Sequence, residues 1–344
     1  MTRAVSRPVR VWVTLLVLLN TSVLFAGFIA PYAANEQNRE LPFAAPTRLH
    51  FVDPGGLVHL RPFVYRVVNK AGSLDEYEED RSQPYPIRFL IPGAPYTVGG
   101  IGAGHHLFGV DEPARVFLFG TDQFGRDVFT RLVFGAQISL IAGVLAAGLA
   151  LALGIAGGAL AGFYGGWADD AVMRAAEIFL ALPWLYLLLA VRSMLPLHID
   201  PARTFLLLVI VIGLVGWARP ARLIRGMVLS AKRRDHVLAA RAFGATDLYL
   251  LRRHVLPQTA GIVLTQLTVL IPRYILAEVT LSFFGLGVTE PVPSWGNMLA
   301  AVQRYDVMTS YWWMFLPGIA LTPVFLLYYA LADALHEHTA FLSP

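Results

Sequence analysis

The side chains that could do chemistry in this chain are few, and most of them are arginines. Lysine occurs only at Lys70 and Lys232, and neither follows a glycine, so the G-x-x-x-x-G-K-[ST] phosphate loop is missing. Cysteine is absent, which excludes disulfides and thiolate metal sites. The adjacent His105 and His106 lack the ligand spacing of a metal site and are interpreted as surface residues. The sequence therefore predicts no catalytic residue and no metal site, and the energy for any work must come from another subunit.

Three ionisable residues fall inside apolar stretches, and these are Glu177, Arg273 and Glu278. A charge in hydrocarbon costs about 2.5 to 3.5 kcal/mol on insertion scales, so each one calls for a partner or a wet cavity. We hypothesise that Arg273 or Glu278 faces a polar translocation path. Two alternatives stay open, namely snorkelling near a membrane interface and pairing with a neighbouring helix.

The densest charged stretch, HVLAARAFGATDLYLLRRHVLPQTAG, covers residues 236–261. Asp235 can cap a helix over 236–243, because its carboxylate can accept hydrogen bonds from the free amides at a helix start. Gly244 suits the left-handed position that ends a helix. The first half of the stretch is therefore predicted to be a short helix that stops at a glycine.

The second half of this stretch is predicted to be another short helix, DLYLLRRHVL. Thr246 and Asp247 offer its cap, and one face of it is shared by Leu248, Leu251 and Val255. Pro257 is expected to close the unit before the next apolar run. The result is a compact protrusion of two helices joined at a glycine.

This protrusion could contact another protein, and two other interpretations of it are possible. A DNA-binding helix-turn-helix needs a third helix and a soluble core, and only about thirty residues separate two apolar runs here, so nucleic-acid binding is not expected. An amphipathic helix on anionic lipid would suit the arginines. The glycine turn and the double capping specify a shape, whereas lipid binding needs only a charged face.

The elements that must position these residues are membrane spans. The chain is 56% hydrophobic and 15% charged, with a mean hydropathy of +0.58, whereas soluble domains carry about 25% charged residues. A span needs about 20 apolar residues, and six apolar runs qualify, at 11–33, 138–163, 176–197, 204–224, 258–284 and 311–335. The first run is longer than the apolar core of a signal peptide, so we expect it to be retained.

The charged segment 219–253 orients these spans. It holds nine cations against Asp235 and Asp247, so the positive-inside rule places it in the cytoplasm. With six spans both termini are then cytoplasmic. The expected organisation is a cytoplasmic N-terminus (1–10), a first span (11–33), an extracytoplasmic insert (34–135), a core of five spans (136–335) that holds the charged loop 230–257, and a cytoplasmic tail (336–344).

The insert at 34–135 is too long for a simple connection. It mixes the acidic run 75–80 with alternating stretches such as LVHLRPFVYRVV and YPIRFLIPG, and several aromatic residues could build a modest core. We expect a small β-rich insert, and a structureless acidic loop is the alternative.

The second span is dominated by small residues. Gly154, Gly158 and Gly162 recur every four residues and therefore share one helix face, which lets another helix backbone approach closely. Packing inside a helical bundle is the expected role of this face. Together with the six apolar runs and the insert, it predicts an all-α membrane protein with six transmembrane helices and one β-rich insert.

Several of these motifs resemble those of ABC-transporter permeases, which carry E-A-A-x3-G-x9-I-x-L-P in their last long cytoplasmic loop. The matching residues are Ala239, Ala240, Gly244, Leu256 and Pro257. Leu238 stands in place of the glutamate and His254 in place of the isoleucine. The stretches 120–140, 162–174, 217–230 and 275–299 are similar to the second permease subunit of dipeptide and oligopeptide importers. The resemblance covers about 120–335 and is weaker over 34–119.

The resemblance implies an ABC importer permease in the inner (cell) membrane. Its expected partners are a second permease, two ATPases that bind ATP and Mg, an extracytoplasmic solute-binding protein and membrane lipid, and this chain itself binds no cofactor. The implied coupling residues, which would seat in an ATPase groove, are Ala239, Ala240, Arg241, Gly244, Ala245, Asp247, Leu256 and Pro257. Peptide is the expected solute, with nickel complexes, glutathione or other solutes as alternatives. A stand-alone carrier or a membrane-embedded enzyme is the alternative from another class, and the sequence shows neither an inverted repeat nor a catalytic pair in a span.

Overall fold

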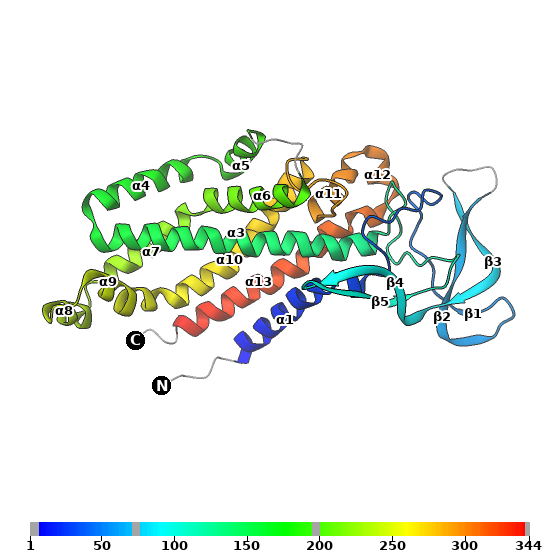
Figure 1. The fold of residues 1–344 in the computed structure, drawn as a ribbon, viewed down its shortest axis with the longest axis horizontal. Helices are drawn as coiled ribbons and strands as arrows, with labels where there is room; N and C mark the ends of the chain where they lie inside the picture. Colours follow the sequence, from blue (N-terminus) through cyan, green and yellow to red (C-terminus); the bar gives the residue numbers. More distant parts are fainter. Residues whose placement is uncertain (1–6, 71–75, 195–199, 341–344) are drawn as a thin grey trace. The chain divides into compact units, whose positions relative to one another are not determined.

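A computed structural model describes residues 7–70, 76–194 and 200–340 of this chain (Figure 1). The expectations for 1–6, 71–75, 195–199 and 341–344 lie outside the described residues, so the predicted span 176–197 is described only to residue 194. Backbone contacts divide the chain into two compact units. Unit 1 comprises Met1–Val17, Leu140–Leu281 and Thr322–Pro344, and unit 2 comprises Leu18–Ser139 and Ser282–Leu321.

Four helical stretches are long and apolar enough to cross a membrane. They are α1 (Arg7–Leu24), α3 (Val128–Tyr164), the stretch Asp247–Phe283 and the stretch Trp312–Glu337. Two bent pairs also pass, which are α4 (Gly166–Ala181) with α5 (Trp184–Ser193), and α6 (Pro201–Gly216) with α7 (Ala218–Ala231). The described part of the chain therefore holds between four and six spans, and six only if each bent pair counts as one.

The predicted span limits differ from the helices at several ends. The first helix stops at Leu24, short of residue 33, and a short α2 (Ala26–Ile29) follows it. Helix α3 starts ten residues before the expected 138, because Asp127 Oδ2 accepts a hydrogen bond from the Thr130 amide (2.8 Å) and so caps an earlier start. Helix α13 (Leu316–Ala340) runs past the expected end at 335 into the predicted tail.

Two of the predicted spans are broken by local chemistry. The run 176–197 bends by 92° between α4 and α5, because Pro183 cannot donate a helical hydrogen bond and disfavours helix in the residue before it. The run 204–224 bends by 44° at Trp217, between α6 and α7. Neither predicted span is therefore one straight helix.

Unit 1 holds α3 and α7 in close contact along the glycine stripe. A Cβ added at Gly154 would lie 2.4 Å from the Pro220 side chain, and one at Gly158 would lie 2.4 Å from the Ala221 carbonyl oxygen. One at Gly162 would lie 2.8 Å from the Arg225 carbonyl oxygen. These distances leave no room for a side chain, so the three glycines set how closely the two backbones approach.

Unit 2 holds the strands. β1 (His50–Val52), β2 (Val58–Asn69) and β3 (Tyr77–Pro86) form one antiparallel sheet, and β4 (Arg88–Val98) and β5 (Ile101–Gly109) form a hairpin. A small apolar cluster under them consists of Val64, Ile87, Phe108, Ala114 and Val116. The unit continues after α10 (Leu256–Phe283) with α11 (Trp295–Ala300) and α12 (Tyr305–Ser310), each followed by a 3-10 turn, Ala301–Gln303 and Trp312–Phe315.

The interpretation of both adjacent histidines as surface residues is wrong for one of them. His105 is exposed, but His106 is only 1% exposed. Its Nδ1 lies 2.6 Å from the Ala30 carbonyl oxygen and its Nε2 lies 3.0 Å from the Ala94 carbonyl oxygen. His106 therefore joins α2 to the β4–β5 hairpin, which adjacent histidines in a sequence cannot reveal.

Candidate functional site

The charged stretch forms a small two-helix unit, which we define as residues 235–257. Helix α8 (Asp235–Ala242) is followed two residues later by Gly244, whose φ is +85°. Residues other than glycine seldom adopt this conformation. The Gly244 amide donates to the Arg241 carbonyl oxygen (3.0 Å), and the Ala245 amide donates to the Ala240 carbonyl oxygen (3.1 Å). This pair of hydrogen bonds is a Schellman motif, so the turn predicted at the glycine has a defined geometry.

The capping predictions hold for the second helix and fail for the first. Thr246 Oγ1 accepts from the Tyr249 amide (3.4 Å) at the start of α9 (Asp247–Leu250). Asp235 is already inside α8, Arg234 occupies the capping position, and no side chain caps that end. The Asp235 carboxylate still lies in the first turn of α8, where a negative charge interacts favourably with the helix dipole.

Pro257 does not close the two-helix unit as predicted. Helix α9 runs through a π-helical turn (Leu251–Val255) directly into α10 (Leu256–Phe283). The Leu256 amide donates to the Leu251 carbonyl oxygen, five residues back. A proline at 257 has no amide to donate and would crowd the preceding turn of an ordinary helix, and the wider π turn accommodates it. The protrusion is therefore continuous with a membrane helix.

The inner face of the two-helix unit is anchored in an apolar cluster of unit 1. Val237 of α8 is 2% exposed, and Leu250 and Val255 are fully buried. They pack with residues of α3 and α7, which include Ala159, Phe163, Ile224 and Val228. Burying each such side chain stabilises by about 1.5–3 kcal/mol relative to exposure. The predicted face of Leu248, Leu251 and Val255 is wrong for Leu248, which is exposed, because α9 buries Leu250 in the cluster instead.

The outer face carries five of the eight residues that the resemblance implies for coupling. Four large apolar side chains are exposed there, and these are Leu238 (49%), Phe243 (93%), Leu248 (57%) and Tyr249 (53%). Ala239, Arg241, Gly244, Asp247 and Pro257 are also exposed, while Ala240, Ala245 and Leu256 are partly buried against the apolar cluster. Arg241 pairs with Asp247 across the turn at 2.9 Å. The unit thus presents apolar side chains on a fixed backbone.

The three ionisable residues that the sequence analysis singled out in apolar runs lie in unit 1. Glu278 is fully buried within α10 and Glu177 is exposed on α4. Arg273 is partly buried, and its guanidinium carbon lies 5.1 Å from the centre of the Trp184 ring, within cation–π range. Arg273 also lines a small cavity of about 30 Å³ together with Arg219.

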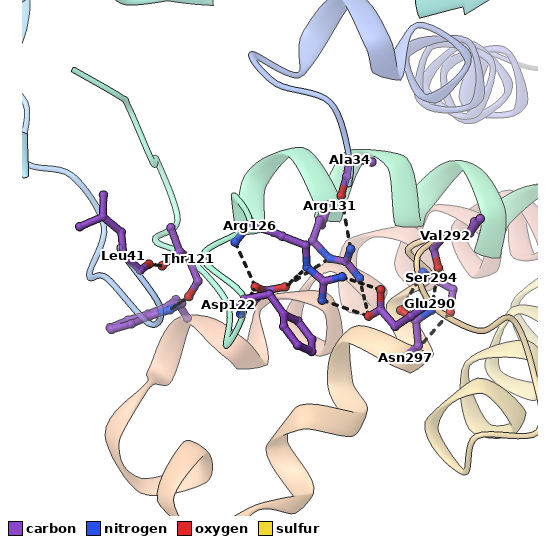
Figure 2. A network of polar contacts seen from close by, with 12 residues as sticks. Ala34, Leu41, Thr121, Asp122, Arg126, Arg131, Glu290, Val292, Ser294 and Asn297 are labelled. Atoms are coloured by element: carbon purple, nitrogen blue, oxygen red, sulfur yellow. Dashed lines mark hydrogen bonds and ion pairs between the residues drawn. The ribbon is translucent and has the colours of Figure 1, made fainter. Parts of the chain in front are cut away.

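A polar network in unit 2 was not predicted from the sequence (Figure 2). Arg126 Nε donates to Asp122 Oδ2 (2.7 Å), and its two terminal nitrogens donate to the Glu290 carboxylate at 2.6 and 3.1 Å. Arg131 donates to the same carboxylate (2.8 Å) and to the Ala34 carbonyl oxygen (3.3 Å). The two arginine side chains are 6% and 2% exposed, so two buried cations are balanced by two carboxylates.

The loop that carries Glu290 is held by its own hydrogen bonds, which Figure 2 also shows. Asn297 donates to the Val288 and Val292 carbonyl oxygens (3.1 and 2.8 Å), and with Ser294 it forms a capping box at the start of α11. A cavity of about 390 Å³ lies beside the network, and its lining includes Arg304. The network therefore ties this loop to the start of α3.

The signal for the network was present in the sequence but not recognisable. Its members stand at the ends of apolar runs, in GTDQFGRD and in VTEPVPSWGN. Arg126 and Glu290 are 164 residues apart, and no periodicity connects them. Only the fold brings the two segments together.

The chain matches a known family and named relatives. The sequence model described as binding-protein-dependent transport system inner membrane component matches residues 154–340. The dipeptide transport system permease protein DppC of Bacillus subtilis is 35% identical over 226 residues, which are 65% of this chain and 68% of that protein. OppC, the oligopeptide transport system permease protein of the same organism, is 37% identical over 215 residues, 62% of this chain and 68% of that protein. A putative peptide permease protein of Brucella suis is 38% identical over 226 residues, 65% and 73% of the two chains.

Proposed function

Because this chain belongs to the family of binding-protein-dependent transport system inner membrane components, we propose that it is one of two permease subunits that form the path for peptides or peptide-like solutes in an ATP-driven importer. The family makes it a multi-pass inner-membrane protein and a transport subunit rather than an enzyme. An importer permease implies partnership with ATPase and binding-protein subunits. A peptide solute is supported by the names of the relatives, which are dipeptide, oligopeptide and peptide permeases.

The two-helix unit is the proposed contact with an ATPase, and its exposed apolar face is the observation that carries this proposal. Phe243 is 93% exposed, although the residues around it are held by a Schellman motif and a buried apolar anchor. Aromatic side chains that a rigid backbone holds in solvent are typical anchors of protein interfaces. Leu238, which replaces the usual glutamate, extends the same face, so this contact relies on apolar burial more than on charge.

Helix continuity explains how such a contact would act on the membrane helices. The helical stretch Asp247–Phe283 includes α9, the π turn and α10, so a displacement of the two-helix unit is transmitted along one helix. That helix carries Arg273 and Glu278, the proposed residues of the translocation path. We therefore propose that ATPase closure moves α10 and changes access to the path.

The β-rich insert is the proposed contact on the opposite side of the membrane. The cations around 219–253 favour a cytoplasmic position for the two-helix unit. With an odd number of spans between the insert and this unit, the insert lies on the outer side of the membrane. The end of its β1–β2 turn and the start of β2 expose Leu57, Val58 and Leu60, the last of them completely. An exposed apolar patch of this kind fits a protein partner, and the binding protein or the second permease is the partner proposed.

A change of Gly244→Asp tests the coupling role. The left-handed backbone and the close docking both favour glycine, so the variant should insert normally while the binding protein no longer stimulates ATP hydrolysis by the reconstituted complex. We expect at least a tenfold loss of that stimulation. The readout is phosphate release in proteoliposomes, with and without the binding protein.

A matched control for this variant is Gly285→Asp. Gly285 also has a positive φ (+73°), open space around it and an amide that donates to the carbonyl oxygen three residues back, but it lies after α10, outside the two-helix unit. Its stimulation should remain within about twofold of wild type. Unchanged stimulation in Gly244→Asp would refute the coupling role, whatever solute the complex transports.

A further inference from the structure

Three irregular points of the helices in unit 1 meet at one small cavity. Its lining includes Leu180 and Trp184 on either side of the α4–α5 break, Gly216 and Ala218 on either side of the α6–α7 break, and Arg273 directly after Pro272 in α10. Backbone irregularities inside membrane helices are tolerated where they line a cavity. In transporters such interrupted helices commonly form the solute site.

The walls of this cavity are fixed by specific contacts. The Tyr274 hydroxyl donates to the Gly216 carbonyl oxygen at 3.1 Å, which satisfies a backbone group at the α6–α7 break. A Cβ at Gly216 would lie 2.0 Å from that hydroxyl oxygen, so any larger residue would displace the Tyr274 ring. Phe179 packs edge-on against Trp217, with ring centres 5.9 Å apart. The cavity is therefore a built feature of the unit.

The charge of the cavity has one sign. Arg219 and Arg273 both line it, and Arg219 also borders an adjoining open cavity of about 440 Å³ with Leu180 and Arg222. Among the described residues, the lining of neither cavity includes an aspartate or a glutamate. This differs from the network around Arg126, where two carboxylates balance two arginines. Cations grouped in a low-dielectric region without carboxylates attract an anion strongly.

The chemistry of the lining selects a carboxylate. Trp184 covers one face of the Arg273 guanidinium, at 5.1 Å, and leaves the N–H groups at its edge to donate. The planar guanidinium matches a carboxylate with two parallel hydrogen bonds. Leu188, Ile212 and Val215 supply an apolar wall, and the open cavity beside Arg219 and Arg222 gives room for the rest of a small solute.

We propose that Arg273 and Arg219, with Trp184 as the wall, form a site in this permease that binds the carboxylate of a peptide-like solute during its passage. The inference rests on the proposed function and adds the chemical group that the path recognises. It makes the free carboxyl end, rather than the side chains, the feature that the permease reads.

Binding to the permease itself tests this site separately from transport. Radiolabelled alanyl-alanine and its C-terminal amide would be bound to the purified permease–ATPase complex in nanodiscs, without the binding protein. The wild-type complex should bind the free acid at least tenfold more tightly than the amide. Arg273→Gln should weaken binding of the acid at least tenfold and leave binding of the amide unchanged, whereas Arg273→Lys should retain part of the preference.

The controls keep the test decisive. If Arg273→Gln fails to assemble, Arg219→Gln is the second test variant, because Arg219 lies at an exposed position of α7. Arg219→Gln should also reduce the preference for the acid. Arg203→Gln, an exposed arginine of α6 away from both cavities, should bind like wild type. Equal binding of acid and amide, an unchanged preference in Arg273→Gln, or no binding of either at millimolar concentration would overturn the site. Binding with the predicted preference but no uptake in proteoliposomes would refute the proposed function alone.

Discussion

Two ion pairs of this protein, one in each unit, show how differently its two polar regions are built. The Arg126–Asp122 pair is 6% and 7% exposed and shares its cation with Glu290, whereas the Arg241–Asp247 pair is 49% and 52% exposed. Buried pairs cannot lose one partner without leaving an uncompensated charge, while exposed pairs are worth about 0–1 kcal/mol. The network therefore holds structure, and the two-helix unit keeps its shape through backbone hydrogen bonds and leaves its side chains available for a partner.

The comparison predicts its largest effect for Arg126→Met. The substitution removes the closest cation of the buried Asp122 carboxylate, which keeps only Arg131 Nε at 3.6 Å, and two of the three hydrogen bonds to Glu290. We therefore expect a loss of about 3–5 kcal/mol in the free energy of unfolding. The measurement is thermal unfolding of the solubilised protein together with its abundance in membranes. Arg304→Met is the matched control, because Arg304 lines the same cavity but pairs with Asp306 at about 57% exposure, and it should cost under about 1 kcal/mol. Equal losses in both variants would contradict the distinction.

A second prediction concerns pH at the start of α3. Burial raises the pKa of Asp127 to about 7, against the hydrogen bonds from Thr130, which lower it, and its Oδ1 has no hydrogen-bond partner within the described residues. The folded protein then holds a proton that the unfolded chain has released between about pH 4 and pH 7, so stability should fall as pH rises through this window and level off above it.

The expected loss between pH 5 and pH 8 is about 1–3 kcal/mol, since each pKa unit corresponds to about 1.4 kcal/mol. Thermal unfolding at both pH values would measure it. Asp127→Asn keeps an oxygen for Thr130 but cannot titrate, and should remove this part of the dependence. A pH dependence that is the same in Asp127→Asn and wild type would show that another group is responsible.

The smallest effect is expected for Arg241→Ala in the two-helix unit. Its pair with Asp247 is half exposed, and the turn is held by the Schellman motif without it, so the free energy of unfolding should change by less than about 1 kcal/mol. The same melting assay measures this. A loss as large as that of Arg126→Met would mean that the exposed pair, and not the backbone, holds the turn.

Sequence reasoning succeeded where local chemistry decides the structure. Gly244 needs a left-handed backbone and Thr246 needs only the next three residues, so both could be predicted, as could strands such as β2 and β4 from alternating residues. Prediction from the sequence failed where two distant segments contact each other, or where packing against a neighbouring helix decides which side chain is buried. The Arg126–Glu290 pair joins distant segments, and packing against α3 and α7 buries Leu250 in place of Leu248. The bent pairs α4–α5 and α6–α7 overlap runs that the sequence predicts as simple spans, because apolar composition does not distinguish a bent helix from a straight one.

The absence of cysteine from the whole sequence allows the central claim to be tested with single cysteines. Phe243→Cys places a thiol on the exposed face of the two-helix unit, and Val58→Cys places one on the exposed turn of the insert. In membranes that contain the assembled complex, a short bifunctional thiol-reactive cross-linker should join position 243 to an ATPase subunit, and position 58 should never reach that subunit. Failure of position 243 to cross-link while position 58 joins an ATPase would contradict both the coupling role and the proposed orientation.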